Sequence, residues 1–118
     1  MRILKSKIAL PPFMAFSTLT VDELKQKLDS KAKVRILDVR NPDELPYGSV
    51  AGSEQIPLPE LEKRYKELDK KEEYVVYCRT GGRSSRACEF LTQKGYKATN
   101  LIGGILAWKK YDPNIQEY

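Results

Sequence analysis

The stretch that decides the fold runs from Tyr74 to Ser84 and reads Tyr-Val-Val-Tyr-Cys-Arg-Thr-Gly-Gly-Arg-Ser. Its first four residues are β-branched or aromatic, which is typical of a buried strand. The two glycines allow a tight loop with positive φ angles. From Ser84 onward, Ala87, Phe90 and Leu91 recur at the spacing of a helix that buries one face. This stretch therefore predicts a strand, a tight loop and a helix in immediate succession.

The sequence on both sides of this stretch alternates in the same way. Predicted helices cover residues 20–29, 58–68 and 103–108, and predicted strands cover residues 34–39, 55–56 and 98–101. Thr20 and Glu23 have the spacing of a capping box at the start of the first helix. The strands are too apolar to have one face in water, which favours a parallel sheet between helices. We predict a three-layer α/β domain with a central parallel sheet and helices on both faces.

Length and composition are consistent with one such domain. The chain has 118 residues, of which 41% are apolar, enough for one modest core. We expect the domain to cover residues 18–118 and residues 1–17 to form an extension or linker, stiffened by Pro11 and Pro12. No apolar run is long enough to span a membrane, and two cysteines are too few for a disulfide-rich secreted scaffold. These features predict a cytoplasmic protein without a membrane segment.

The charge pattern limits the kinds of partner and chemistry. The chain carries 21 basic and 16 acidic residues, a surplus that favours anionic partners. The charges alternate in sign along the predicted helices instead of gathering beside aromatic residues, so we expect no nucleic acid partner. The chain has no histidine, the commonest general base and metal ligand. We therefore predict chemistry by other side chains or by the backbone, without a metal or another cofactor.

Cys78 is the predicted nucleophile. Ligands of open α/β sheets bind at the carboxyl ends of the strands, where a loop that leads into a helix can point several N–H groups at an anion. The nearby positive charges of Arg79, Arg83 and Arg86 are expected to lower the pKa of the thiol from about 8.5 toward neutrality. The predicted anion cradle consists of Arg79, Thr80, Gly81, Gly82 and Arg83. The prediction requires that solvent can reach Cys78, and the alternative is a cysteine that only packs in the core.

Four polar residues are predicted to support this site: Asp38, Arg40, Glu44 and Ser84. Arg40 and Glu44 are four residues apart around a proline turn and are expected to form a structural ion pair. Asp38 is expected to accept hydrogen bonds from nearby loop amides. The second cysteine, Cys88, is predicted to be a core residue in the following helix and not a second reactive thiol.

The cysteine loop, together with Gly103-Gly-Ile-Leu-Ala-Trp108, resembles the rhodanese-like sulfurtransferases. Asp38-Val-Arg40 with Glu44, and Gly52 with Ile56-Pro57, match other motifs of that family. The resemblance implies a rhodanese-like three-layer fold. It also implies that Cys78 takes a sulfane sulfur from thiosulfate or a persulfide, holds it as a persulfide and passes it to a thiophilic acceptor. Such a transfer is chemically a thiol–disulfide exchange in which the cradle amides hold the anions.

The closing residues 107–118, together with Ile56-Pro-Leu-Pro-Glu60, resemble one branch of that family in particular. They are similar to the rhodanese domains at the carboxyl end of adenylyltransferase/sulfurtransferase proteins, which activate ubiquitin-like sulfur carriers for molybdopterin and thiamine synthesis or tRNA thiolation. The resemblance implies a small anionic sulfur donor, and a ubiquitin-like sulfur carrier or a cysteine desulfurase as protein partner. Many members carry His-Ile-Pro-Gly-Ala where this chain has Ser49-Val-Ala-Gly-Ser53. We expect this difference to alter packing or partner contacts more than the chemistry.

Two alternative functions remain open at this point. A phosphatase or arsenate reductase of the same fold needs Cys-x5-Arg, whereas here Arg83 stands at Cys-x4-Arg and Ser84 occupies the next position. A catalytically silent rhodanese-like module that only binds proteins usually lacks the cysteine, which this chain retains.

Overall fold

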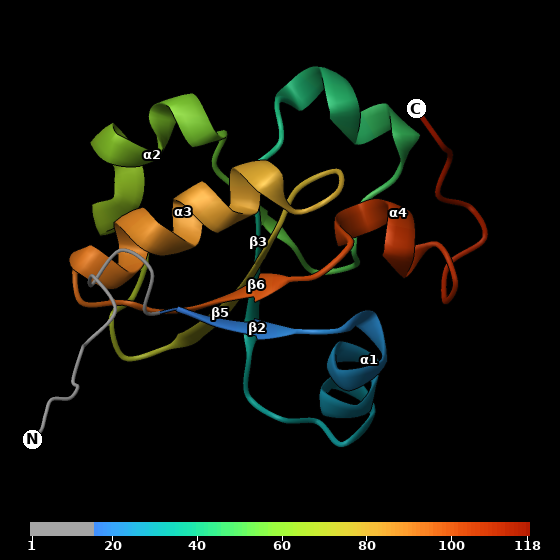
Figure 1. Ribbon diagram of the computed structural model, residues 1–118, viewed down its shortest axis with the longest axis horizontal. Coiled ribbons are helices and arrows are strands. Elements are labelled where there is room, and N and C mark those ends of the chain that lie inside the picture. Colours follow the sequence, from blue (N-terminus) through green and yellow to red (C-terminus); the bar gives the residue numbers. More distant parts are fainter. Residues whose placement is uncertain (1–15) are drawn as a thin grey trace, which may run out of the picture.

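The structure is a computed structural model, which describes residues 16–118 (Figure 1). Within this part of the chain, one five-stranded sheet has the order β2-β6-β5-β3-β4, and all neighbouring strands are parallel. The strands are β2 (Ser17–Leu19), β3 (Arg35–Asp38), β4 (Glu54–Gln55), β5 (Glu73–Tyr77) and β6 (Lys97–Leu101). The helices are α1 (Val21–Asp29), α2 (Leu58–Arg64), α3 (Gly82–Gln93) and α4 (Gly104–Trp108), with the 3-10 helices η2 (Pro42–Tyr47) and η3 (Tyr65–Glu67).

The central strand β5 contributes to a hydrophobic core on each face of the sheet. Tyr74 and Val76 belong to the cluster that contains buried residues of α2 and α3, whereas Val75 and Tyr77 belong to the cluster of α1 and α4. Successive side chains of an extended strand point to opposite faces, which explains the alternation. Figure 1 shows α2 and α3 on one side of the sheet and α1 on the other. The predicted three-layer α/β fold is therefore confirmed.

Strand β2 was not predicted from the sequence. Its residues Ser17–Leu19 pair in parallel with Thr99–Leu101 of β6. Ser-Thr-Leu is short and mostly polar, so pairing with a neighbouring strand, and not local preference, makes it extended. Of the predicted extension over residues 1–17, residues 1–15 with the two prolines lie outside the described residues, and Ser17 is part of β2.

The other elements agree closely with the prediction. The capping box is present, because the Glu23 N–H donates to Thr20 Oγ1 at 3.1 Å and the Thr20 N–H donates to the Glu23 carboxylate at 2.8 Å. The predicted helix over residues 58–68 is α2 followed by η3, and α3 begins at Gly82, before the predicted start at Ser84. From residue 16 to residue 118, no helix combines the length and the apolarity that crossing a membrane requires.

Candidate active site

Cys78 lies directly after β5, in the loop that leads into α3. The Gly81 N–H donates to Cys78 Sγ at 3.1 Å, and Ser84 Oγ, in the first turn of α3, lies 3.4 Å from the same sulfur. Gly81 has a φ of +126°, which residues with a side chain rarely adopt, so the turn requires glycine here. Gly82 was predicted to share this role, but it is the first residue of α3 and has no positive φ.

The electrostatics of the loop favour the thiolate form of Cys78. Burial alone would raise the pKa of the thiol, but hydrogen bonds from the Ser84 side chain and from the N–H groups of Ser84, Gly81 and Thr80 outweigh burial and lower the pKa below its ordinary value. The direction of the shift agrees with the prediction. Its cause differs, since the hydrogen bonds act on the thiol more than the arginine charges do. Within the predicted cradle, Thr80 and Gly81 are thus the residues whose amides face the sulfur.

Cys78 is only 1% exposed in this conformation. The expectation of a thiol in contact with solvent is therefore not met. The physical reason is packing, because Cys78 belongs to the hydrophobic cluster that contains buried residues of α2 and α3, as in the alternative of a cysteine that packs in the core. With 1% exposure, the sulfur is open to a ligand only if atoms around the loop move aside.

The start of α4 fixes the loop from its other side. The Ile105 N–H donates to the Cys78 carbonyl at 2.9 Å, and the Leu106 N–H donates to the Arg79 carbonyl at 3.3 Å. Gly104 has a φ of +57°, and a Cβ placed on it would lie 2.5 Å from both of those carbonyl oxygens. Glycine at this position thus lets α4 approach closely enough to pin the loop backbone.

The ion pairs differ from the predicted one. Arg40 pairs with Asp38 at 2.8 Å, and both side chains are completely buried. The Glu44 carboxylate instead makes a bidentate pair with Arg83 at 2.6 and 2.8 Å, and Arg40 reaches only the Glu44 backbone carbonyl, at 3.4 Å. The predicted Arg40–Glu44 ion pair is therefore wrong. Residues two apart along an extended chain share a face, which brings Asp38 to Arg40, while η2 directs Glu44 toward α3.

These two ion pairs affect the pKa of Glu44 and the hydrogen bonds of Asp38 at the end of β3. Hydrogen bonding from Arg83, opposed by partial burial and aided by the Asn41 N–H, lowers the pKa of Glu44 to about 2. Asp38 accepts from the Arg40 N–H at 2.9 Å, as predicted for a loop amide, and also from the Tyr77 hydroxyl at 2.9 Å. Burial raises the pKa of Tyr77 to about 12, so Tyr77 remains a hydrogen-bond donor to Asp38.

Two residues beside the loop were missed from the sequence. Asn100 is buried and donates from Nδ2 to the Gly81 carbonyl at 3.4 Å and to Ser85 Oγ at 3.1 Å, so it helps to hold the turn that aims the Gly81 N–H. The available signal in the sequence was that Asn100 is a polar residue within the predicted strand 98–101. Tyr118 places its ring 5.2 Å from the guanidinium carbon of Arg79, a contact for which the local sequence carries no signal.

The remaining predicted features lie as follows. Cys88 is fully buried among core residues, as expected, and burial raises its pKa to about 12. Ser49 accepts a long hydrogen bond of 3.4 Å from Arg40, whose Nη2 also donates to the Gly48 carbonyl at 2.8 Å. Ser49 thus contacts the buried Asp38–Arg40 pair, which agrees with a role in packing. Arg86 is exposed on α3.

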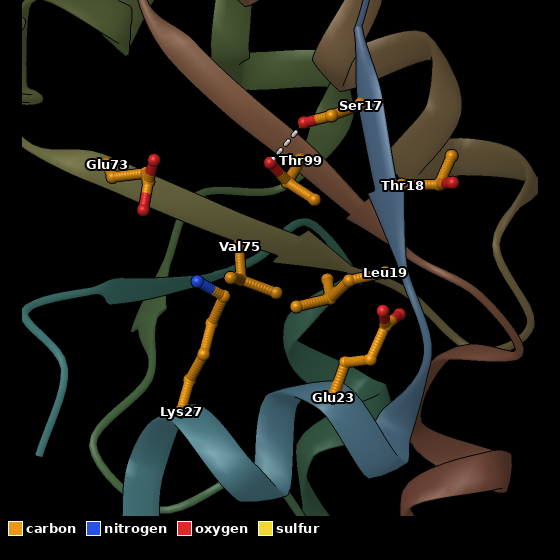
Figure 2. Close-up of a pocket in the computed structure, with 8 residues that line it drawn as sticks. All are labelled: Ser17, Thr18, Leu19, Glu23, Lys27, Glu73, Val75 and Thr99. Atoms are coloured by element: carbon orange, nitrogen blue, oxygen red, sulfur yellow. Dashed lines mark hydrogen bonds between the residues drawn. The ribbon is translucent and has the colours of Figure 1, made fainter. Parts of the chain in front are cut away.

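A pocket of about 260 Å³ lies elsewhere, between α1 and strands β2, β5 and β6. Figure 2 shows the charged groups of Glu23, Lys27 and Glu73 around it, with the hydroxyls of Ser17 and Thr99 hydrogen-bonded to each other. None of the cysteine-loop residues lines this pocket, and it holds no nucleophilic thiol. We therefore take the Cys78 loop as the candidate active site.

Comparison with known proteins identifies the family to which the chain is similar. The model of the rhodanese-like domain family matches residues 20–111. A sulfurtransferase of Allochromatium vinosum is 37% identical over 91 residues, which are 76% of this chain and 85% of that protein. The probable adenylyltransferase/sulfurtransferase MoeZ of Mycobacterium tuberculosis is 36% identical over 106 residues, which are 86% of this chain and 27% of MoeZ.

Solved structures support the same relationship. The crystal structure of a rhodanese-related protein from Thermoplasma volcanium matches with a TM-score of 0.76 at 35% sequence identity, covering 82% of this chain and 94% of that one. The fold, the cysteine loop and these matches lead to one conclusion. The chain belongs to the rhodanese-like domain family.

Proposed function

We propose that the protein is a rhodanese-type sulfurtransferase that carries a sulfane sulfur on Cys78 as a persulfide. The observation that carries this proposal is the hydrogen bonding around the sulfur, in which Gly81 and Ser84 hold Cys78 and its pKa is lowered. A thiolate is the nucleophile in exchange at sulfur. The loop therefore supplies a reactive sulfur without the histidine that this chain lacks.

The transfer consists of two displacements at sulfur. With thiosulfate as donor, the Cys78 thiolate attacks the outer sulfur, the S–S bond of thiosulfate breaks, and its electron pair leaves on sulfite. The new S–S bond makes Cys78 a persulfide anion. A thiolate or cyanide acceptor then attacks the outer sulfur of that persulfide, and the Cys78 thiolate is released. The cradle amides of Thr80 and Gly81 stabilise negative charge on either form of the cysteine.

The contacts of Arg83 favour this function over phosphoryl transfer. A phosphatase loop uses its arginine to bind the phosphoryl oxygens. Here both terminal nitrogens of Arg83 donate to the Glu44 carboxylate, at 2.6 and 2.8 Å. An arginine with this bidentate partner has less capacity to bind a doubly charged oxyanion, which supports sulfur chemistry.

The proposed donor is a small anion, and the proposed protein partner is a ubiquitin-like sulfur carrier or a cysteine desulfurase. The net charge of +5 favours anionic ligands, and within residues 16–118 neither Arg79 nor Arg86 forms a salt bridge. The similarity to MoeZ, which is named a probable adenylyltransferase/sulfurtransferase, supports a role in sulfur transfer, and the resemblance of residues 107–118 to that branch of the family suggests the carrier. We place the protein in the cytoplasm, where its two free cysteines would stay reduced.

The test measures sulfur on the intact protein. After incubation with thiosulfate and removal of the donor, the wild type should gain the mass of one sulfur atom, and cyanide should remove that atom as thiocyanate. Cys78→Ser should gain none, while the matched variant Cys88→Ser should behave as the wild type does. Absence of the gain in a wild type whose Cys78 reacts with iodoacetamide would favour a silent binding module. Hydrolysis of para-nitrophenyl phosphate that depends on Cys78 would favour a phosphatase.

A further inference from the structure

Tyr118 contacts the active-site loop through its ring. The ring stacks on Tyr47 with centroids 4.4 Å apart and an interplanar angle of 9°. The guanidinium carbon of Arg79, the residue next to Cys78, lies 5.2 Å from the centre of the same ring. A guanidinium at this distance from an aromatic face is attracted to it. The ring therefore restricts where the Arg79 side chain can be.

The hydroxyl of Tyr118 joins the two ion pairs of the site. It accepts from Arg40 Nη1 at 3.0 Å and donates to Glu44 Oε1 at 2.9 Å. The same Glu44 carboxylate holds Arg83 in the first turn of α3. Both hydrogen bonds of the hydroxyl are charge-assisted, which makes them stronger than bonds between neutral groups. They hold the tyrosine ring in one position relative to the loop.

The segment that leads to Tyr118 is itself anchored to the domain. Ile115 is buried in the hydrophobic cluster of α1 and α4. The Gln116 N–H donates to the Tyr47 carbonyl at 2.8 Å. The position of Tyr118 thus follows from the burial of Ile115 and from the hydrogen bond of Gln116 to η2, and not from the loop alone.

The two arginines of the loop are left in different electrostatic states. Both terminal nitrogens of Arg83 donate to Glu44, which neutralises its charge. For Arg79, the described part of the chain provides an aromatic face but no carboxylate partner. An aromatic face attracts the cation without occupying its N–H groups, so those groups stay available to an anion.

We propose that Tyr118 is a positioning residue for sulfur donors, because its ring holds in one place the unpaired guanidinium of Arg79, the residue that follows Cys78 in the loop, and thereby presents a preorganised cation to the anionic end of the donor. The choice of an anionic donor rests on the proposed function. Preorganisation reduces the entropy lost on binding. Tyr118 is therefore expected to strengthen the binding of an anionic reagent more than it changes the nucleophilicity of the Cys78 thiolate.

The test compares two reagents of nearly equal shape and different charge. Iodoacetate is an anion and iodoacetamide is neutral, and both alkylate a thiolate. The ratio of their rate constants at Cys78, located by peptide mass analysis, reports how strongly the loop attracts an anion and needs no sulfur transfer. In Tyr118→Leu we expect this ratio to fall by about two- to fivefold, the effect of losing one exposed cation–π contact. Tyr118→Phe loses the two hydrogen bonds but keeps the ring and its stacking on Tyr47, and it should retain most of the ratio.

Two further variants isolate the contact with Arg79. Arg79→Met should lower the ratio at least as much as Tyr118→Leu does, and the double variant should lower it no further than Arg79→Met alone. The matched control is Tyr111→Leu, since Tyr111 contacts Trp108 and Asp22 and not the loop. It should leave the ratio unchanged. With thiosulfate as substrate, Tyr118→Leu should raise KM and leave kcat within about twofold of the wild type, as expected for lost ground-state binding.

Several results would overturn the proposal. They are an unchanged ratio in Tyr118→Leu, an equal loss in Tyr118→Phe, a further loss in the double variant, or a wild-type Cys78 that reacts with neither reagent. If Tyr118→Leu does not fold, the NMR shifts of the Arg79 δ protons in the wild type decide, since a ring 5.2 Å away should move them upfield and an unshifted signal contradicts the contact. A Tyr118-dependent ratio without sulfur uptake from thiosulfate would refute the proposed function and not the positioning role.

Discussion

The pair between Glu44 and Arg83 connects η2 to the start of α3, and its loss should be measurable as stability. The Glu44 side chain is 13% exposed and that of Arg83 is 34% exposed. Lowering the pKa of Glu44 from 4.5 to about 2 corresponds, at about 1.4 kcal/mol for each pH unit, to an upper limit of roughly 3.5 kcal/mol. Because Arg83 is about one-third exposed, solvent screening reduces this limit, and we expect Glu44→Gln to destabilise the fold by about 1–2 kcal/mol at pH 7.

The dependence on pH follows from the direction of the pKa shift. The pKa of Glu44 is lower in the folded protein than in the unfolded chain, so its ionised form stabilises the fold above pH 4.5, and this contribution disappears as the pH falls toward 2. Gln at position 44 does not titrate. The difference in unfolding free energy between the wild type and Glu44→Gln should therefore be constant from pH 8 to pH 6. By pH 3 it should have shrunk to about half or less.

Urea denaturation at pH 7, 5 and 3, followed by far-ultraviolet circular dichroism, measures this difference. Glu67→Gln provides the matched control, since Glu67 pairs with Arg64 on the surface and lies outside the candidate site, and its effect should be much smaller. Equal stability of Glu44→Gln and the wild type at pH 7 would refute the reasoning. So would a difference that stays undiminished at pH 3, because the stabilisation would then not come from the ionised carboxylate.

Three further outcomes are expected from the geometry of the loop. Gly104→Ala should lower the free energy of unfolding by about 2 kcal/mol or more, because the added Cβ would lie 2.5 Å from the carbonyl oxygens of Cys78 and Arg79. The control Gly82→Ala should change the melting temperature little, because no atom lies within 4 Å of its added Cβ. Similar melting temperatures of the two variants would contradict the close approach of α4. Ser84→Ala removes a hydrogen bond that lowers the pKa of Cys78, so the midpoint of the pH–rate profile for alkylation by iodoacetamide should move to higher pH. An unmoved midpoint would show that Ser84 does not lower the pKa of Cys78. Burial raises the pKa of Cys88 to about 12, so Cys88 should resist alkylation at pH 8 in the folded protein and should react in urea. Alkylation of Cys88 in the folded protein would show that this thiol lies nearer the surface than its full burial indicates.

Local patterns in the sequence were sufficient for most of the helices and strands and for the place of Cys78 between a strand and a helix. The capping box of Thr20 and Glu23 joins residues three apart, and the alternation from Tyr74 to Tyr77 reflects the geometry of a single strand. The position of Cys78 between a strand and a helix follows from the same local information. A three-residue edge strand such as β2 carries too little of this signal, since its conformation depends on hydrogen bonds to β6.

The partners of the charged groups were decided by the tertiary structure. Local spacing suggested that Arg40 pairs with Glu44, but Glu44 binds Arg83, which is 39 residues away, and Tyr118, which is 74 residues away. The burial of Cys78 likewise depends on the tertiary structure, in which α4 is hydrogen-bonded to the backbone of the loop. Spacing along the chain identifies groups that can interact through one helix or strand, whereas pairing across elements depends on the packing of separate segments, which no local pattern encodes.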